Sequence, residues 1–263
     1  MFVAICALVA AVAAYGWSGL ILAAGSRESG NALHSKLWWI GTALQGIGFG
    51  ASVMARTVMP LLLVQSAIAG GLAVTAFLEH VTGVRRMRPV EAFSVGAVVL
   101  GVIAVAVAVV PGTTRPPEAS DVVISLGLLA LVACLVPFAR TSALSGACSG
   151  TSFGVGAISA RFLVGTDAPW QDLVRFWDWS GITWTLVMMM PLSMVVGQWA
   201  LTRGLSFGAS VAALGSDYLV ATIVPSIFGM LLMGEQMRSG LMPVAVAGML
   251  MAVWGTRRLL VHH

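Results

Sequence analysis

One acidic residue, Asp217, lies inside a long apolar run and is the clearest candidate for chemistry in the chain. An ionisable group at bilayer depth is costly, so such groups usually face a cavity or a partner and mark a substrate or ion pathway. We therefore expect Asp217 to bind a proton or a cation, or to pair with a basic group, with Ser216 and Tyr218 beside it. If its helix began later, Asp217 would instead cap that helix near the membrane interface.

Other polar and aromatic side chains within apolar runs could line the same cavity. Arg161 is the natural partner for Asp217 if their helices adjoin, and it could otherwise extend to the membrane interface. Glutamine can bridge two helices or line a polar cavity, and aromatic rings can form cavity walls or serve as packing and interface anchors. The remaining candidates for a substrate or coupling site are Gln45, Gln65, Gln198, Tyr15 and Trp184.

The composition places these residues in a membrane protein. Of 263 residues, 59% are hydrophobic and 9% are charged, whereas soluble domains carry about 25% charged residues. A membrane-spanning helix needs roughly 20 apolar residues, so the chain has room for about eight to ten spans and no sizeable soluble domain. The single lysine and the thirteen arginines lie mostly at segment ends, which indicates topology signals rather than a nucleic-acid surface.

Apolar runs bounded by arginine, proline, glycine or acidic clusters predict an all-α fold of nine transmembrane helices. A stretch rich in tryptophan and charge, residues 167–178, is expected at the membrane interface. In the sixth span, Gly150 and Gly154 have a spacing that lets helix backbones pack closely or that permits a flexible gate. The predicted spans are residues 2–24, 37–55, 60–78, 92–110, 122–139, 142–164, 181–201, 207–233 and 241–260.

The distribution of basic residues predicts an orientation in the membrane. Lysine and arginine are enriched on the cytoplasmic side of membrane proteins. With the N-terminus outside, nine of these residues fall inside and five fall outside. We therefore expect a multi-pass protein of the plasma (inner) membrane, with its N-terminus outside and its C-terminus in the cytoplasm.

The two halves of the chain share one pattern of elements. When Arg56 is aligned with Arg203, each half has an apolar helix that ends at arginine, a second helix that ends in a short polar turn with an acidic residue, and one further helix. A single connecting helix would invert the second half relative to the first. The sequence thus predicts a 4+1+4 inverted repeat, with the first repeat at 1–111, the connecting helix at 119–140 and the second repeat at 141–263.

Two short motifs accompany this layout. The first is Leu-Gln-Gly-Ile-Gly-Phe-Gly at 44–50, followed by Arg56 and Leu-Val-Gln at 63–65, and the second is Gln-Trp-Ala-Leu-Thr-Arg-Gly at 198–204, followed by Gly-Glu at 234–235. The layout and the motifs resemble the drug/metabolite transporter superfamily, in particular its nine-helix branch with the magnesium-transporter-like proteins and similar actinobacterial members. The resemblance implies an alternating-access carrier with a central cavity between the repeats. Substrates in this superfamily range from amino acids and nucleotide sugars to drugs, metal ions and lipid-linked sugars.

We expect a secondary carrier of a small metabolite or a lipid-linked substrate, with proton coupling as one option. A flippase for a lipid-linked sugar or phospholipid, a divalent cation transporter and a non-transporting subunit of a membrane complex are the alternatives. Divalent cations favour several oxygen ligands, so a single intramembrane carboxylate counts against the second alternative. Asp217 and the turn Glu-His at 79–80 depart from the superfamily pattern.

The sequence contains no convincing enzyme signature. Residues 146–150 imitate a nucleophile elbow with Cys148 in place of serine, but they have no strand context. There is no HExxH motif, phosphate-binding loop or pair of metal-ligand histidines. We therefore expect no catalysis, no metal and no cofactor. The expected partners are membrane lipids and the substrate, with no nucleic acid, and the chain is expected to be a monomer or homodimer.

Overall fold

The computed structural model describes residues 2–28, 34–83, 89–110, 116–164, 176–207, 210–232 and 236–261. Helices dominate these residues, because the backbone polar groups of a lipid-embedded chain must hydrogen-bond within the protein, and a helix does this locally. The α-helices are α1 (Phe2–Glu28), α2 (Lys36–Arg56), α3 (Leu61–Ala69), α4 (Gly71–Val81), α5 (Pro89–Ala108), α6 (Ala119–Leu135), α7 (Ser142–Val164), α9 (Gly181–Ser206), α10 (Ser210–Leu232) and α11 (Met242–Val261).

Several segments of this part of the chain are able to cross a membrane. By length and apolar composition, five segments qualify. This finding confirms the prediction of a helical, multi-pass membrane protein at that level. The five segments are Phe2–Ser26, Leu61–Leu78, Ala119–Phe138, Gly181–Ser206 and Ala213–Leu232.

The predicted span at 60–78 is not a single regular helix. It consists of α3 and α4, which meet at Gly70. The backbone N–H of Gly70 donates to the carbonyl of Ala67 at 2.9 Å, a bond to the third preceding residue that tightens the turn. Such a local change in hydrogen bonding bends a helix. The glycine pair Gly70-Gly71 in an apolar run does not by itself reveal this break from sequence.

Two short strands also differ from the all-α prediction. Strand β1 (Val109–Val110) follows α5 and pairs antiparallel with β2 (Gln236–Met237), which precedes α11. This ladder joins one end of α5 to the segment that leads into α11. Of the stretch predicted at the membrane interface, only residues 176–178 lie within the described residues, and they form the 3-10 turn η3 (Phe176–Asp178).

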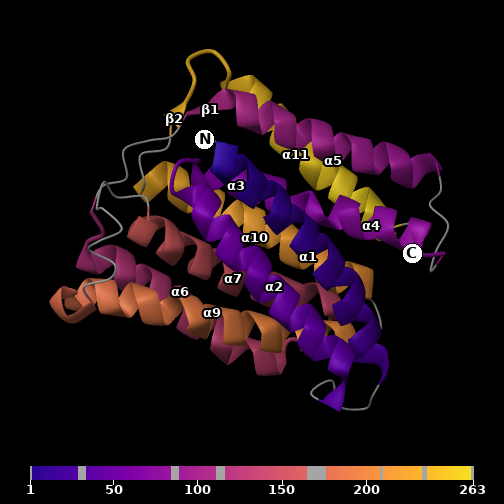
Figure 1. Cartoon of the computed structure of the whole chain (residues 1–263), viewed down its shortest axis with the longest axis horizontal. Coiled ribbons are helices and arrows are strands. Elements are labelled where there is room, and N and C mark those ends of the chain that lie inside the picture. Colours follow the sequence, from indigo (N-terminus) through magenta and orange to yellow (C-terminus); the bar gives the residue numbers. More distant parts are fainter. Residues whose placement is uncertain are drawn as a thin grey trace.

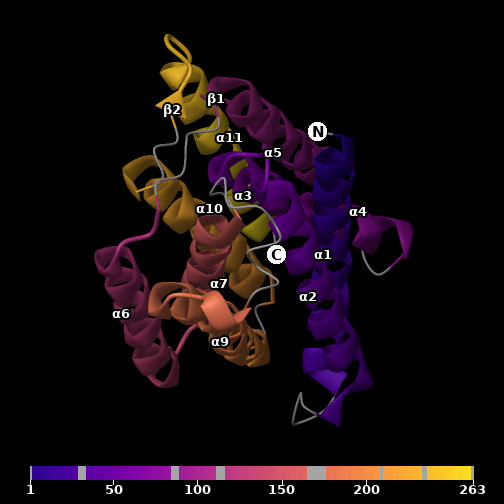
Figure 2. The ribbon, with the colours of Figure 1, turned by 60° about the vertical axis from the view of Figure 1, so that its left-hand side comes forward.

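The helices pack mainly in pairs (Figure 1). The α1 helix packs along α2, α7 packs along α9 and α10, and α5 packs along α11. The α3 helix contacts α10 and so joins the two halves of the chain. Figure 2 shows α6 beside α7 and α9, on the side away from α1 and α2.

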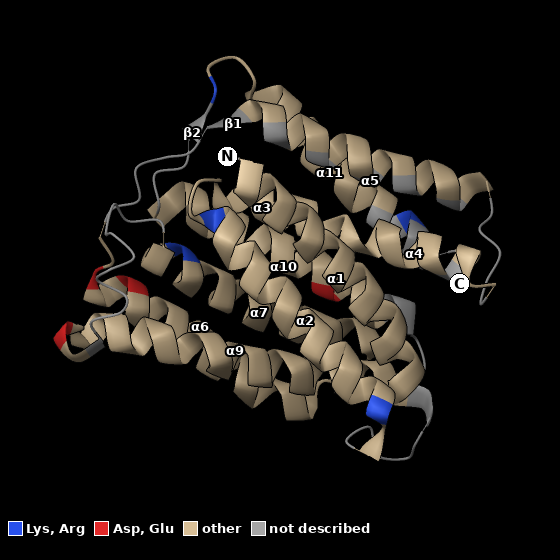
Figure 3. Cartoon of the chain, in the orientation of Figure 1, with Lys and Arg blue, Asp and Glu red and all other residues tan. Residues whose placement is uncertain are grey.

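Charged residues lie mostly toward the ends of the helices (Figure 3). Among the acidic residues of the described helices, only Asp217 lies more than one turn from a helix end. Buried residues are chiefly apolar and form two large clusters. The first cluster involves α6, α7 and α9, and the second joins α1, α2, α3 and α10.

Small residues on α7 allow α10 to approach closely. A β-carbon at Gly146 would collide with the carbonyl oxygen of Ala213, and one at Gly150 would collide with that of Asp217. At Gly154 a β-carbon would lie 3.2 Å from the ring of Pro225. The close packing predicted from the glycine spacing is therefore confirmed, and it places the backbone of Asp217 directly against α7.

Substitution of Gly150 by alanine should destabilise the protein. The added methyl group would force α7 and α10 apart, and overpacking of this kind costs about 1–3 kcal/mol. We expect the melting temperature of Gly150→Ala in detergent to fall by several degrees. The matched control is Gly127→Ala in α6, where a β-carbon meets nothing within 4 Å and alanine favours the helix. Equal melting temperatures for the two variants would contradict this account.

Candidate functional site

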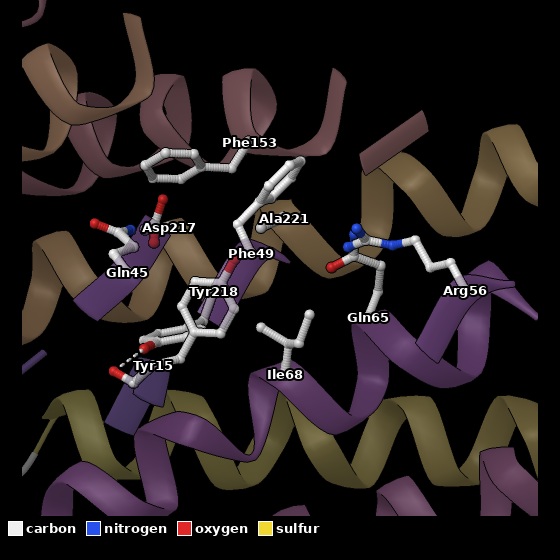
Figure 4. Close-up of a pocket in the computed structure, with 10 residues that line it drawn as sticks. All are labelled: Tyr15, Gln45, Phe49, Arg56, Gln65, Ile68, Phe153, Asp217, Tyr218 and Ala221. Carbon is white, nitrogen blue, oxygen red and sulfur yellow. Dashed lines mark hydrogen bonds between the residues drawn. The ribbon is translucent and has the colours of Figure 1, made fainter. Parts of the chain in front are cut away.

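A small polar pocket lies where α1, α2, α3, α7 and α10 meet (Figure 4). Its volume is about 20 Å³, counted as the space open to the centres of water molecules, which suits one or two waters. Five of the residues predicted for a substrate or coupling site line it. The lining residues are Tyr15, Gln45, Phe49, Arg56, Gln65, Ile68, Phe153, Asp217, Tyr218 and Ala221.

Asp217 occupies one end of this pocket, beside Gln45 (Figure 4). Because α10 begins at Ser210, Asp217 lies about two turns inside the helix and does not cap it. Only 5% of the residue is exposed. Its carboxyl oxygen Oδ1 has no hydrogen-bond partner among the described residues, although Ser149 of α7 lies beside the carboxyl group.

Arg56 occupies the other end of the pocket, and sequence reasoning missed it (Figure 4). The side chain turns inward, so that only 1% of the residue is exposed. With the Gln65 amide oriented to satisfy its hydrogen bonds, the Gln65 side-chain oxygen accepts from Nη2 of Arg56 at 3.1 Å. The guanidinium also lies 5.5 Å from the centre of the Phe49 ring. Its Nε and Nη1 groups have no hydrogen-bond partner within the described part of the chain.

Arg203, which the predicted repeat pairs with Arg56, has a different environment. Its Nε donates to the carbonyl of Ala139 at 3.2 Å, and its Nη2 donates to that of Pro137 at 3.1 Å. Its guanidinium also stacks over Phe207 at 5.6 Å. Arg203 therefore ties the end of α9 to the segment after α6, whereas Arg56 presents its charge to the pocket.

The expectations for Arg161 are corrected. The side chain is 3% exposed, so it does not extend to the membrane interface. Its Nη1 donates to the backbone carbonyl of Arg56. That carbonyl belongs to the last residue of α2, where carbonyl groups lack partners within the helix. Arg161 thus holds the end of α2 and does not line the pocket that contains Asp217.

Two tyrosines separate the charged ends of the pocket. The Tyr218 hydroxyl donates to the backbone carbonyl of Tyr15 at 3.1 Å and so joins α10 to α1. Tyr15 lies within electrostatic range of both Arg56 and Asp217. A β-carbon at Gly71 would lie 3.3 Å from Cβ of Tyr15 and 3.5 Å from the Tyr218 hydroxyl, so the helix break brings α4 close to this pair.

Three other predicted site residues lie outside the pocket. Gln198 donates from Nε2 to Oγ1 of Thr42 at 2.9 Å and bridges α9 to α2. Trp184 is 40% exposed and packs edge-on against Trp179. The Ser216 hydroxyl donates to the carbonyl of Ala213 at 3.1 Å, within α10.

The pocket combines charged, polar and aromatic side chains. The described residues contain no group of three or more His, Cys, Asp or Glu side chains that could hold a metal. The pocket instead offers one carboxyl group, one guanidinium and two amides between aromatic walls. No protein-family model, no curated protein and no solved structure matches the chain.

The two arginines should respond in opposite ways to substitution by methionine, which preserves most of the apolar length of the side chain. Arg203→Met leaves two backbone carbonyls without donors, and we expect a loss of about 1–3 kcal/mol and a lower melting temperature. Arg56→Met removes a buried charge whose donors are only partly satisfied, so at a pH low enough to keep Asp217 protonated we expect an unchanged or higher melting temperature. Thermal unfolding of both variants in detergent checks this. A similar decrease in both would show that Arg56 mainly supports the fold.

Proposed function

We propose that this chain is a secondary carrier that works by alternating access and that binds its substrate in the pocket between Arg56 and Asp217. The observation that supports this proposal is the burial of two opposite charges, both with polar atoms that lack partners in the described structure, in one cavity of a membrane protein. Such groups are costly in a lipid-embedded bundle and usually mark a transport pathway.

The helix arrangement supports the same proposal. We count α3 and α4 as one interrupted passage, which gives nine passages among the helices that the structure describes. The α1–α2 pair then corresponds to the α7–α9 pair, while α5 meets α11 and α3 meets α10, as a 4+1+4 inverted repeat requires. The two chain ends lie toward opposite ends of the helices, as an odd number of passages requires (Figure 1). Interrupted helices beside a central site are common in carriers.

The pocket also favours a carrier over the alternatives. A non-transporting subunit would be expected to have a fully packed centre in place of a pocket. A divalent cation site would need several oxygen ligands, more than a single carboxylate supplies. A flippase would need a lateral opening between helices for its lipid. We place the carrier in the plasma (inner) membrane with its N-terminus outside, as the distribution of basic residues favours.

Labelling of a pocket cysteine from both sides of the membrane would test alternating access without knowledge of the substrate. Cys6, Cys134 and Cys148 are first replaced by serine or alanine, and Ala221 is changed to cysteine in the pocket wall. We expect a membrane-impermeant thiol reagent to label Ala221→Cys from either side in oriented proteoliposomes, because each side gains access in turn.

The matched control is Ala157→Cys, at a residue that is 1% exposed and belongs to a hydrophobic cluster instead of the pocket. It should remain unlabelled from both sides. Labelling of Ala221→Cys from one side only, or from neither, would contradict the carrier proposal.

A further inference from the structure

The pocket holds two opposite charges that do not neutralise each other directly. Figure 4 shows Arg56 and Asp217 at its two ends, with aromatic rings between them. Each residue is at least 95% buried, and each keeps polar atoms without a hydrogen-bond partner in the described structure. A buried guanidinium attracts an anion strongly, because charges interact more strongly away from water.

The comparison of Arg56 with Arg203 indicates that the guanidinium of Arg56 serves a ligand. Arg203 satisfies its donors on two loop carbonyls. Arg56 lines the pocket and retains two nitrogens without partners among the described residues. Arginine presents up to five N–H donors in a plane that matches carboxylate geometry.

We propose that Arg56 binds the carboxylate group of a small organic monoanion and that this anion is carried together with one proton on Asp217. This inference rests on the proposed carrier function and names its substrate class and coupling. The aromatic walls, Phe49 and Phe153, would contact the apolar part of the anion.

The charge balance of the pocket explains the coupling. With Asp217 ionised and Arg56 charged, the empty pocket has no net charge. A proton alone leaves one buried positive charge, and an anion alone leaves one buried negative charge. A proton and an anion together restore neutrality. Because an uncompensated buried charge is costly, only the empty and the doubly loaded pocket should close and reorient readily.

The same balance specifies a monoanion. A dianion such as hydrogen phosphate would leave a net negative charge even with Asp217 protonated. The pocket has room for one or two waters in this structure, so the proposed substrate has a short body and enters when the surrounding helices move apart. The substrate class is therefore a small monocarboxylate.

Few other groups can respond to pH at this site. The titratable or charged side chains that share the pocket with Asp217 are Tyr15 of α1, Arg56 of α2 and Tyr218 of α10. On α7, Ser149 lies beside Asp217, while Cys148 belongs to the cluster with α6 and α9. The pocket-lining residues include none from α4, α9 or α11. Proton binding at this site is therefore assigned to Asp217.

Proton uptake during anion binding tests the proposal. Weakly buffered protein in detergent is titrated with formate, acetate or L-lactate, while a pH dye reports protons and intrinsic tryptophan fluorescence reports binding. We expect about one proton to be taken up per bound anion, and the affinity to fall about tenfold per pH unit once Asp217 is ionised, because the two ligands are thermodynamically linked.

Four variants separate the contributions of the charged groups. Arg56→Gln should abolish anion binding at every pH. Arg56→Lys keeps the positive charge but not the planar set of donors, so it should bind the anion more weakly than the unmodified protein. Asp217→Asn should bind the anion with an affinity that does not depend on pH and without proton uptake. Arg203→Gln, the matched control, should keep both binding and proton uptake.

Several results would overturn the inference. Binding without proton uptake in the unmodified protein would exclude the coupling. Binding of inorganic phosphate in place of the monocarboxylates would exclude the substrate class, and so would the absence of binding by all three probes. The labelling of Ala221→Cys tests the carrier itself, so these failures are distinguishable from failure of the proposed function.

Discussion

The lipid surroundings provide no hydrogen-bond partners, so each polar group within the bundle must find one inside the protein. Most described serine and threonine hydroxyls meet this constraint within their own helix, by donating to a carbonyl three or four residues earlier. Other polar side chains meet it through bonds that join separate helices. Gln198 bridges α9 to α2, and Tyr218 joins α10 to α1. Arg161 holds the end of α2, and Arg203 holds the segment after α6. Arg56 and Asp217 are the charged residues of the pocket, and both keep polar atoms without a hydrogen-bond partner in the described structure. The functional argument depends on these two residues.

Close backbone contact positions one of these two groups. Helices in lipid gain little from the hydrophobic effect between them, so tight packing at small residues becomes the main source of association. Gly146 and Gly150 bring α7 against α10 at Ala213 and Asp217. The pocket wall therefore combines helices from both halves of the chain, and relative motion of the halves would open it without unfolding any helix.

Apart from the break at Gly70, the extent of most described helices could be predicted well, because apolar runs and their polar boundaries are local properties. The span predicted at 142–164 is α7, with the same limits.

The side of each helix that faces the pocket could not be predicted as well. Gln198 and Trp184 were plausible site residues, yet their helix turns them toward α2 and toward an exposed aromatic pair. Arg56 was missed because an arginine at the end of an apolar run gives the same sequence signal whether it turns outward or inward. Only the tertiary position of Gln65 and Phe49 shows that it turns inward.

The alignment that pairs Arg56 with Arg203 also places Gly70 opposite Asp217. In the repeat that we propose, one half thus has a helix break at the position where the other half has a carboxyl group. Two inward arginines would have left a pocket with net positive charge, and two carboxyl groups would have left a pocket with net negative charge. The pocket instead contains one charge of each sign. The proposed repeat would supply the symmetry that two alternating states require, but the coupling we propose depends on a difference between the halves, because only unlike charges make the empty and the fully loaded pocket equally neutral.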